Sequence, residues 1–151
     1  MNQKKINPII ILYADDDAED RMLAKEAMEQ SRIANEIFFV EDGEEIMEFL
    51  NNQGKYADMA RYPVPGLILL DLNMPKKDGR EVIKEIRANP KLRTIPVVIL
   101  TTSEAEEDII STYDLGVNSF ITKPVTFDAL VEIMKTLRKY WFEIVELPHN
   151  N

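Results

Sequence analysis

The chain has 151 residues, 45% of them hydrophobic and 30% charged, a composition that excludes a disordered chain and fits one folded domain. Its net charge of -9 argues against nucleic acid as a partner, because phosphate binding needs a basic surface. The absence of cysteine excludes disulfides and thiolate zinc sites. We expect a single domain over residues 1–151, with its core at about 9–144.

The amino-terminal segment superficially resembles a signal peptide, because two lysines precede an apolar run. That run is short and ends in three aspartates, where a cleavage site needs small neutral residues. No segment reaches the roughly 18 consecutive apolar residues of a membrane helix. We therefore expect a cytoplasmic location and no membrane partner.

Short apolar runs alternate with helical patterns along the chain. The runs consistent with strands are residues 9–14, 37–40, 66–71, 96–101 and 118–122. The first, third and fourth are almost continuously apolar, as expected of central strands in a parallel sheet covered on both faces. Because strands that alternate with helices form right-handed βαβ units, the pattern predicts an α/β fold, a (βα)5 doubly wound parallel sheet.

Capping patterns and one apolar stripe indicate the helices. Asp42, Asp78 and Ser103 are each followed three residues later by a glutamate, as in a capping box. The last helix carries a stripe at spacings of three or four residues, formed by Leu130, Ile133, Met134, Leu137, Trp141 and Ile144. The connection 51–66 has no clear period and is longer than the roughly two to six residues of such loops, so we expect a helix extension or a partner contact there.

Polar side chains follow four of the predicted strands at the point where each strand ends. These residues are Asp15, Asp16 and Asp17 after the first strand, and Asp71, Thr101 and Lys123 at the ends of the third, fourth and fifth. Each has a plain structural explanation on its own, since polar residues commonly follow strands. In open parallel sheets, however, ligands bind outside the carboxyl ends of the strands. Their joint placement favours a binding site.

The residue types at this edge indicate phosphoryl chemistry. Carboxylates suit Mg²⁺ or Mn²⁺, and Mg²⁺ usually takes one or two carboxylates together with water and a phosphate. An ammonium and a hydroxyl pair with phosphoryl oxygens, which gives a use to Lys123 and Thr101. The set therefore points to phosphoryl transfer to an aspartate.

Several motifs, in matching order and spacing, resemble the receiver domains of two-component response regulators. They are ADDD at 14–17, LLDLNMPKKDG at 69–79, ILTTSE at 99–104 and GVNSFITKP at 116–124. The carboxyl-terminal part and the long 51–66 connection are similar to the stand-alone regulators that partner cyanobacterial-type phytochrome histidine kinases. The resemblance implies a flavodoxin-like sheet of strand order 2-1-3-4-5. It also implies a signalling switch that receives a phosphoryl group from a histidine kinase, and not an enzyme beyond its own phosphorylation and dephosphorylation.

Carried over to this sequence, the resemblance implies that Asp71 is the phosphoacceptor. Mg²⁺ or Mn²⁺ would be bound by Asp16 directly, by Asp15 partly through water, by Asp71 and by the backbone carbonyl of Asn73. Asp17 lies where the family uses no metal ligand, and we expect it to cap the first helix.

The same resemblance implies a switch around the phosphoryl group. Thr101 would turn toward that group, Phe120 would rotate inward, and Lys123 would pair with the phosphoryl oxygens. A cis bond would precede Pro124, as the family usually has. The switch would alter the face made by the fourth helix, fifth strand and fifth helix, which contacts a downstream protein or forms a homodimer.

Aromatic residues 140–142, at the end of the last helix, either anchor such a contact or cover the body of the domain. His149, the one histidine, is expected to be inert, so phosphate must come from a separate kinase.

Two alternatives come from other classes of protein. An aspartate-nucleophile phosphohydrolase places its nucleophile after its first strand in a DxD arrangement under a cap domain, whereas here the first strand gives ADDD and we expect no cap. A degenerate receiver that only binds partners would have lost Asp71, Lys123 or an acid of the first-strand pair, and all are present.

Overall fold

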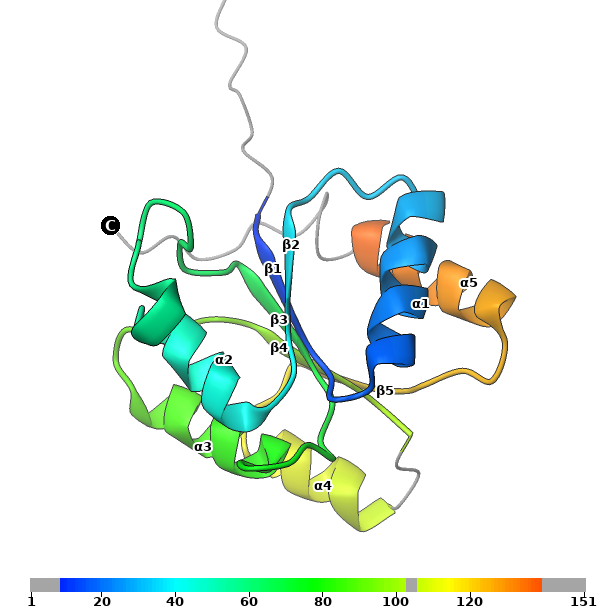
Figure 1. Ribbon diagram of the computed structural model, residues 1–151. Coiled ribbons are helices and arrows are strands. Elements are labelled where there is room, and N and C mark those ends of the chain that lie inside the picture. Colours follow the sequence, from blue (N-terminus) through cyan, green and yellow to red (C-terminus); the bar gives the residue numbers. More distant parts are fainter. Residues whose placement is uncertain (1–8, 103–105, 140–151) are drawn as a thin grey trace, which may run out of the picture.

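A parallel sheet runs through the middle of the molecule with helices on both of its faces (Figure 1). The computed structural model describes residues 9–102 and 106–139. The strands are β1 (Ile11–Ala14), β2 (Ile37–Val40), β3 (Leu67–Leu70), β4 (Val97–Thr101) and β5 (Ser119–Thr122). The helices are α1 (Ala18–Gln30), α2 (Gly43–Leu50), α3 (Gly79–Ala88), α4 (Glu106–Asp114) and α5 (Phe127–Leu137), with a 3-10 turn η1 (Gly54–Tyr56).

The strands pair in the order β2-β1-β3-β4-β5, and all four pairings are parallel. Each strand lies inside the apolar run that predicted it. The predicted (βα)5 doubly wound fold and its strand order are therefore confirmed. Because every strand runs in the same direction, the residues that follow the strands meet at one edge of the sheet.

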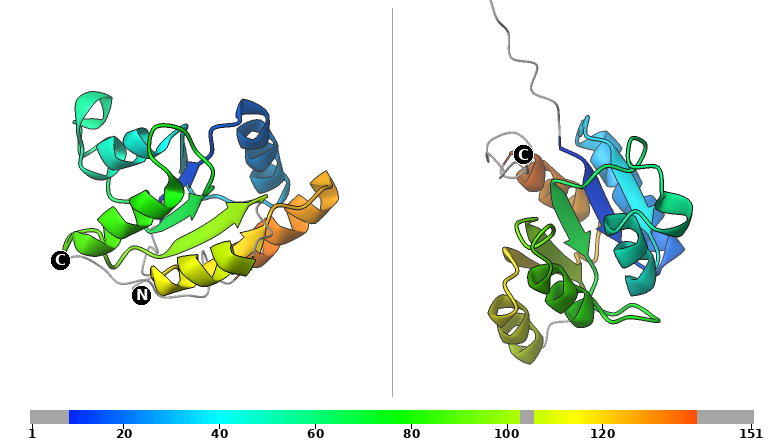
Figure 2. Two further views of the ribbon diagram at one scale, coloured as in Figure 1. Left: turned by 90° about the horizontal axis from the view of Figure 1, so that it is seen from below. Right: turned by 90° about the vertical axis from the view of Figure 1, so that its left-hand side faces the viewer.

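Two apolar clusters fill the space on the two faces of the sheet, because alternate strand residues point to opposite sides. Ile11 and Tyr13 of β1 pack with α1 and α5, whereas Leu12 and Ala14 pack with α2 and α3. Figure 2 shows the helices on either side of the sheet from two further directions. The central strands are buried on both faces, which explains their continuous apolar sequence.

Helix caps follow the predicted residues, with one difference in geometry. Asp17 accepts hydrogen bonds from the N–H groups of Glu19 and Asp20, so the predicted cap of α1 is confirmed. Asp42 accepts from the N–H of Glu45, as a capping box requires. At α3, by contrast, Asp78 accepts from the N–H two residues on, because a short aspartate side chain readily closes such a turn. Ser103 lies outside the described residues.

The connection 51–66 holds an aromatic cluster that had no sequence period to reveal it. Its helical part is the single turn η1. Four rings contact one another there at centroid distances of 5.0 to 5.8 Å. The members of this aromatic cluster are Phe38 of β2, Phe49 of α2, and Tyr56 and Tyr62 of the connection. The amide of Asn52 donates to the carbonyls of Tyr56 and Tyr62 and so ties the segment to itself.

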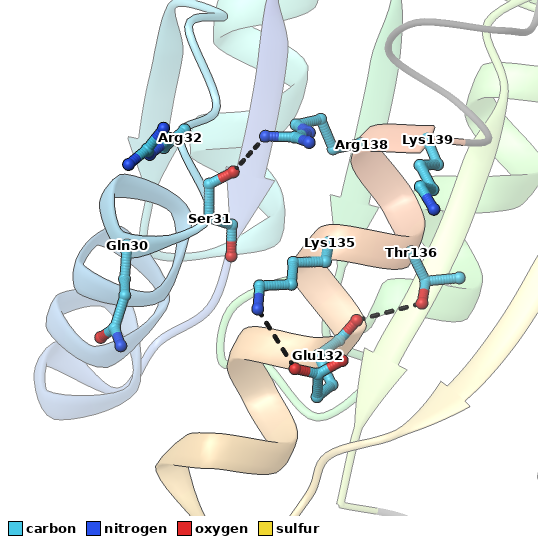
Figure 3. Close-up of a pocket in the computed structure, with 8 residues that line it drawn as sticks. All are labelled: Gln30, Ser31, Arg32, Glu132, Lys135, Thr136, Arg138 and Lys139. Carbon is cyan, nitrogen blue, oxygen red and sulfur yellow. Dashed lines mark hydrogen bonds and ion pairs between the residues drawn. The ribbon is translucent and has the colours of Figure 1, made fainter.

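At the opposite end of the sheet from the strand carboxyl ends, α1 and α5 are joined through Ser31. The Arg138 guanidinium donates to the Ser31 carbonyl at 2.7 Å (Figure 3). The Ser31 hydroxyl donates to the carbonyls of Ala27 and Val131. A cavity of about 440 Å³ beside this contact is lined by basic side chains, Arg32, Lys135, Arg138 and Lys139, together with Glu132 and neutral polar residues of the two helix ends. Cations at this place offset the partial negative charge of helix carboxyl termini.

In the apolar stripe predicted for the last helix, Met134 and Leu137 are buried and Leu130 and Ile133 are partly buried against the same cluster. Trp141, Ile144, the aromatic residues 140–142 and His149 lie outside the described residues. None of the helices within 9–102 and 106–139 is long and apolar enough to cross a membrane.

Candidate functional site

The carboxyl edge of the sheet brings the predicted site residues together. Asp15 and Asp16 follow β1, Asp71 follows β3, Thr101 is the last residue of β4, and Lys123 follows β5. Asp15, Asp71 and Thr101 are buried, with 0%, 6% and 0% of their surface exposed, whereas Asp16 is exposed. Charged groups are rarely buried unless they are paired, so the contacts of this cluster decide what it can do.

Lys123 lies at the centre of the cluster and holds three carboxylates. Its ammonium donates to Asp15 Oδ2 at 2.6 Å, to Asp71 Oδ2 at 2.8 Å and to Asp20 Oδ2 at 2.9 Å. The side chain of Lys123 is 11% exposed, so water screens these pairs little. One cation thus balances acids from two strand ends and from the first turn of α1.

Asp71 accepts three hydrogen bonds within the cluster. Its Oδ1 accepts from the Thr101 hydroxyl at 2.7 Å and from the Asn73 N–H at 3.1 Å, while its Oδ2 accepts from Lys123. Three donors from three parts of the chain therefore hold one carboxylate in a fixed orientation. The hydroxyl and the ammonium that the sequence paired with a phosphoryl group are both hydrogen-bonded to the predicted acceptor.

Gly79 allows the segment after Asp71 to fold back closely. A Cβ at Gly79 would lie 2.8 Å from the Leu72 Cα and 2.9 Å from the Asp71 carbonyl oxygen, both backbone atoms that cannot move aside cheaply. The Gly79 N–H donates to the Leu72 carbonyl at 3.0 Å. The start of α3 is in this way pressed against the backbone that carries Asp71, which fixes the position of the carboxylate.

The electrostatics of the cluster follow from burial and crowding. Burial raises the pKa of Asp15 above its usual range, although hydrogen bonds from Lys123 and the Asp17 N–H oppose the change. Burial alone would lower the pKa of Lys123, but the bonds to Asp15, Asp71 and Asp20 outweigh it and raise that pKa, so Lys123 stays charged. Burial, with the nearby charge of Asp15, also raises the pKa of Tyr13. The site therefore holds more negative charge than its one lysine neutralises.

A divalent cation fits this excess of carboxylates. Asp15, Asp16 and Asp71 each offer an oxygen, and the three oxygens lie within 4.8 Å of one another. Hard oxygen donors with this charge suit Mg²⁺ or Mn²⁺. The N–H of Asn73 is turned to Asp71, and the role of its carbonyl as a further ligand stays a prediction.

Phe120, the predicted switch residue, lies in β5 and is partly buried against the cluster formed with α2 and α3. Its N–H donates to the hydroxyl of Tyr113 in α4 at 3.1 Å. The expectation of a cis bond before Pro124 is wrong for this structure, in which every described peptide bond is trans. The two isomers of a bond to proline differ by only about 0.5–1 kcal/mol, so sequence alone does not decide between them.

Sequence reasoning missed two residues. Asp20 was not among the predicted site residues, yet its carboxylate reaches Lys123. Its signal was an acid three residues after the cap residue Asp17, in the first turn of a helix that starts at this edge. Tyr113 had no signal, because its partner is a backbone N–H on another element.

A five-stranded 2-1-3-4-5 parallel sheet with paired acids, a further aspartate, a hydroxyl and a lysine at its carboxyl edge is the arrangement of a signalling domain controlled by phosphorylation. Residues 11–135 match the response regulator receiver domain family, and the chain belongs to that family of two-component signalling proteins.

The most informative relatives are regulators of the same size. The chain is 43% identical to response regulator Rcp1 of Synechocystis sp. over 148 residues, which cover 98% of this chain and 99% of that protein. The crystal structure of Mn²⁺-bound Rcp1 aligns with a TM-score of 0.84 at 44% identity, covering 94% of this chain and 100% of that one. The phosphorylated cyanobacterial phytochrome response regulator RcpA aligns with a TM-score of 0.86 at 43% identity, covering 93% and 99%.

Proposed function

We propose that the protein works as a single receiver domain in which Asp71 accepts a phosphoryl group from a histidine kinase. The observation that carries the proposal is the convergence of Thr101 and Lys123 on the Asp71 carboxylate, beside the acids that follow β1. Phosphoryl transfer needs a positioned oxygen nucleophile and groups that neutralise charge on the phosphoryl oxygens. The carboxyl edge of the sheet supplies both.

The chemical step is a displacement at phosphorus. A carboxylate oxygen of Asp71 forms the new O–P bond, while the bond from phosphorus to the donor breaks and its electron pair leaves on the donor. The donor is the imidazole nitrogen of a phosphohistidine or, in a test tube, the acetate of acetyl phosphate. The Lys123 ammonium and the Thr101 hydroxyl, both already on Asp71, donate to phosphoryl oxygens as their charge develops.

Asp15, Asp16 and Asp71 would hold Mg²⁺ or Mn²⁺ together with the backbone carbonyl of Asn73. When bound, the cation supplies charge neutralisation and orientation for the phosphoryl group. The Mn²⁺-bound form of Rcp1 supports this assignment. Beyond promoting its own phosphorylation and dephosphorylation, the domain acts as a switch and not as an enzyme on other substrates.

The switch runs from Thr101 to Phe120 and α4. When the Thr101 hydroxyl follows the phosphoryl group, Phe120 is free to rotate inward behind it. Contacts that help to hold α4 in its present position include the ion pair of Asp108 with Arg80 of α3 and the bond from the Phe120 N–H to Tyr113. A change at Phe120 therefore alters the face formed by α4, β5 and α5, which we propose as the surface for a homodimer or a downstream protein.

The kinase partner we propose is of the phytochrome type. The support is the likeness to RcpA and to the response regulator RPA3017, described in red light signalling of R. palustris, which aligns with a TM-score of 0.89 at 32% identity. Such phosphotransfer places the protein in the cytoplasm, where ATP-dependent kinases obtain their phosphate.

The test is intact mass after incubation with acetyl phosphate, with and without Mg²⁺. We expect the wild-type chain to gain one phosphoryl group only with Mg²⁺, and hydroxylamine to remove it, as it does from an acyl phosphate. Asp71→Asn should gain none. Asp114→Asn is the matched control, because Asp114 is an exposed aspartate at the end of α4, and it should behave as wild type.

An unmodified wild-type chain, or a phosphoryl group that persists in Asp71→Asn, would contradict the proposal. The kinase assignment is tested separately, by phosphotransfer from a phytochrome-type histidine kinase compared with one from another signalling system.

A further inference from the structure

The ammonium of Lys123 has three hydrogens, and all three are in use. A lysine ammonium donates three hydrogen bonds and accepts none. Here the three go to Asp15, Asp71 and Asp20, at 2.6, 2.8 and 2.9 Å. A phosphoryl oxygen that takes a hydrogen bond from Lys123 must therefore displace one of these carboxylates.

The three carboxylates are not held equally. The side chains of Asp15 and Asp71 are 1% and 8% exposed, and each carries further hydrogen bonds from the backbone. The side chain of Asp20 is 36% exposed and its distance to Lys123 is the longest of the three. Water can replace Lys123 as the partner of Asp20, so the Asp20 bond costs least to break.

The backbone of the first turn of α1 fixes the position of Asp20. Asp17 caps α1 by accepting from the N–H groups of Glu19 and Asp20. The cap sets the first turn of the helix, and that turn directs the Asp20 carboxylate back to the carboxyl edge of the sheet, where it meets Lys123. The third aspartate after β1 thus brings a further acid to the site without touching Lys123 itself.

We propose that Asp20 is a positioning residue for Lys123 that competes with the phosphoryl group. While Asp71 is unmodified, Asp20 accepts the third hydrogen of the ammonium, and on phosphorylation it gives that hydrogen up to a phosphoryl oxygen. The inference rests on the proposed phosphorylation of Asp71.

The competition slows phosphorylation for two reasons. First, the Asp20 bond stabilises the unmodified state and is lost in the transition state, and such an interaction raises the barrier. Second, the Asp20 carboxylate lies one ammonium away from Asp71, so its negative charge repels the phosphoryl group. Removal of the charge at Asp20 should therefore speed phosphorylation and prolong the phosphorylated state.

The experiment compares wild type with Asp20→Asn, which has the same shape without the charge. Phosphorylation by acetyl phosphate in Mg²⁺ is followed by intact mass over a range of donor concentrations, and the decay is followed after donor removal. We expect the maximal rate to rise about three- to tenfold, the range for loss of one partly exposed charged hydrogen bond, and the decay to slow. Asp20→Glu, which keeps the charge, should return the rate toward wild type.

Glu19→Gln is the matched control. Glu19 is the neighbouring exposed acid in the same turn, and the hydrogen bonds of Lys123 within the described residues go to Asp15, Asp20 and Asp71 and not to Glu19. It makes the same change in net charge, so it should alter only the donor concentration needed and leave the maximal rate unchanged. A purely structural role of Asp20 would change the melting temperature and leave the maximal rate as it was.

The inference is overturned if Asp20→Asn is phosphorylated no faster than wild type, or if Glu19→Gln is accelerated equally. In both cases the wild type is phosphorylated, and only the role of Asp20 fails. If neither wild type nor Asp20→Asn accepts a phosphoryl group, the proposed function itself fails.

Discussion

The carboxyl edge of the sheet and the aromatic cluster near α2 gather opposite kinds of side chain, charged groups in the first and aromatic rings in the second. At the edge, the carboxylates of Asp15, Asp20 and Asp71 surround a single ammonium, and that of Asp16 lies close to those of Asp15 and Asp71. In the aromatic cluster, tilted and edge-on rings pack together, and the Tyr56 hydroxyl at its rim donates to Glu45. The first arrangement costs stability and supports chemistry, whereas the second contributes stability and has no chemistry of its own.

The pKa of one carboxyl group in each region shows this difference. Burial raises the pKa of Asp15, so folding disfavours the ionised form of this carboxyl group. Burial also acts to raise the pKa of Glu45 beside the aromatic cluster, but hydrogen bonds from Lys55, the Glu41 N–H and Tyr56 lower it overall. The neighbouring Tyr56 hydroxyl, buried and bonded to Glu45, has its pKa raised to about 12. The folded structure therefore favours the ionised form of Glu45 beside the aromatic cluster and disfavours that of Asp15 at the carboxyl edge.

The largest expected effect is on stability at the aromatic cluster. Phe49 is 1% exposed and contacts three other rings, so Phe49→Ala should lower the free energy of unfolding by about 3–5 kcal/mol in urea titrations. Phe49→Leu, which leaves a smaller cavity, should lose less. Both variants should still be phosphorylated as far as they are folded, and a loss of phosphorylation in folded Phe49→Leu would refute the separation of the two regions.

Bound Mg²⁺ should offset the repulsion among the carboxylates at the carboxyl edge and so raise the free energy of unfolding. A ligand at about 100 times its dissociation constant raises the free energy of unfolding by about 2.7 kcal/mol, if it binds only the folded state. We expect this increment in wild type and in Phe49→Leu. In Asp16→Asn, which removes an exposed acid of the cation site, the increment should fall at the same Mg²⁺ concentration. An equal increment in all three proteins would contradict the assigned cation site.

Without Mg²⁺, Asp15→Asn should be more stable than wild type near neutral pH, by about 1–2 kcal/mol, because one of several crowded charges is removed. The raised pKa fixes the sign: the stability contributed by Asp15 is full below its ordinary pKa of 3.8 and lost as the pH rises through the folded value. The advantage of the variant should therefore disappear in acid. Urea titrations at several pH values measure it, and a variant less stable than wild type at pH 7 would show that the ion pair with Lys123 outweighs burial.

Glu45→Gln should have the smallest effect and the opposite pH dependence. We expect a loss of about 1 kcal/mol at neutral pH, since the bonds to Lys55 and Tyr56 lose their charge. Because the folded pKa is lowered, this contribution is full above the ordinary value of 4.5 and is lost as the pH falls through the folded pKa. Glu44→Gln, at an exposed position in the same helical turn, should show no such change between pH 7 and acid.

Much of the fold could be predicted because the strands carry their own signal. Central strands buried on both faces must be apolar throughout, and turns with helix caps separate them. The aromatic cluster could not be predicted, because Tyr56 and Tyr62 meet Phe38 and Phe49 across the fold and not along a regular element. Long-range contacts of this kind leave no period in the sequence.

The candidate site likewise contains residues that the sequence could place and one that it could not. Asp15, Asp71, Thr101 and Lys123 could be placed together because parallel strands deliver their following residues to one edge. Asp20 was missed because its arrival depends on the angle at which α1 leaves β1, which the cap at Asp17 sets. Strand order brings groups near one another, and the hydrogen-bond partners of each are decided by local geometry.

The Tyr113 hydroxyl also affects whether strand β5 can pair with a strand of another chain. Strand β5 is the last strand of the sheet, and an edge strand with free N–H groups is a template on which a foreign strand can pair and aggregation can start. By accepting the Phe120 N–H, Tyr113 of α4 covers one of these groups. Any movement that carries α4 away from β5 uncovers it, so the position of one helix governs both the partner surface and the exposure of the sheet to unwanted strand pairing.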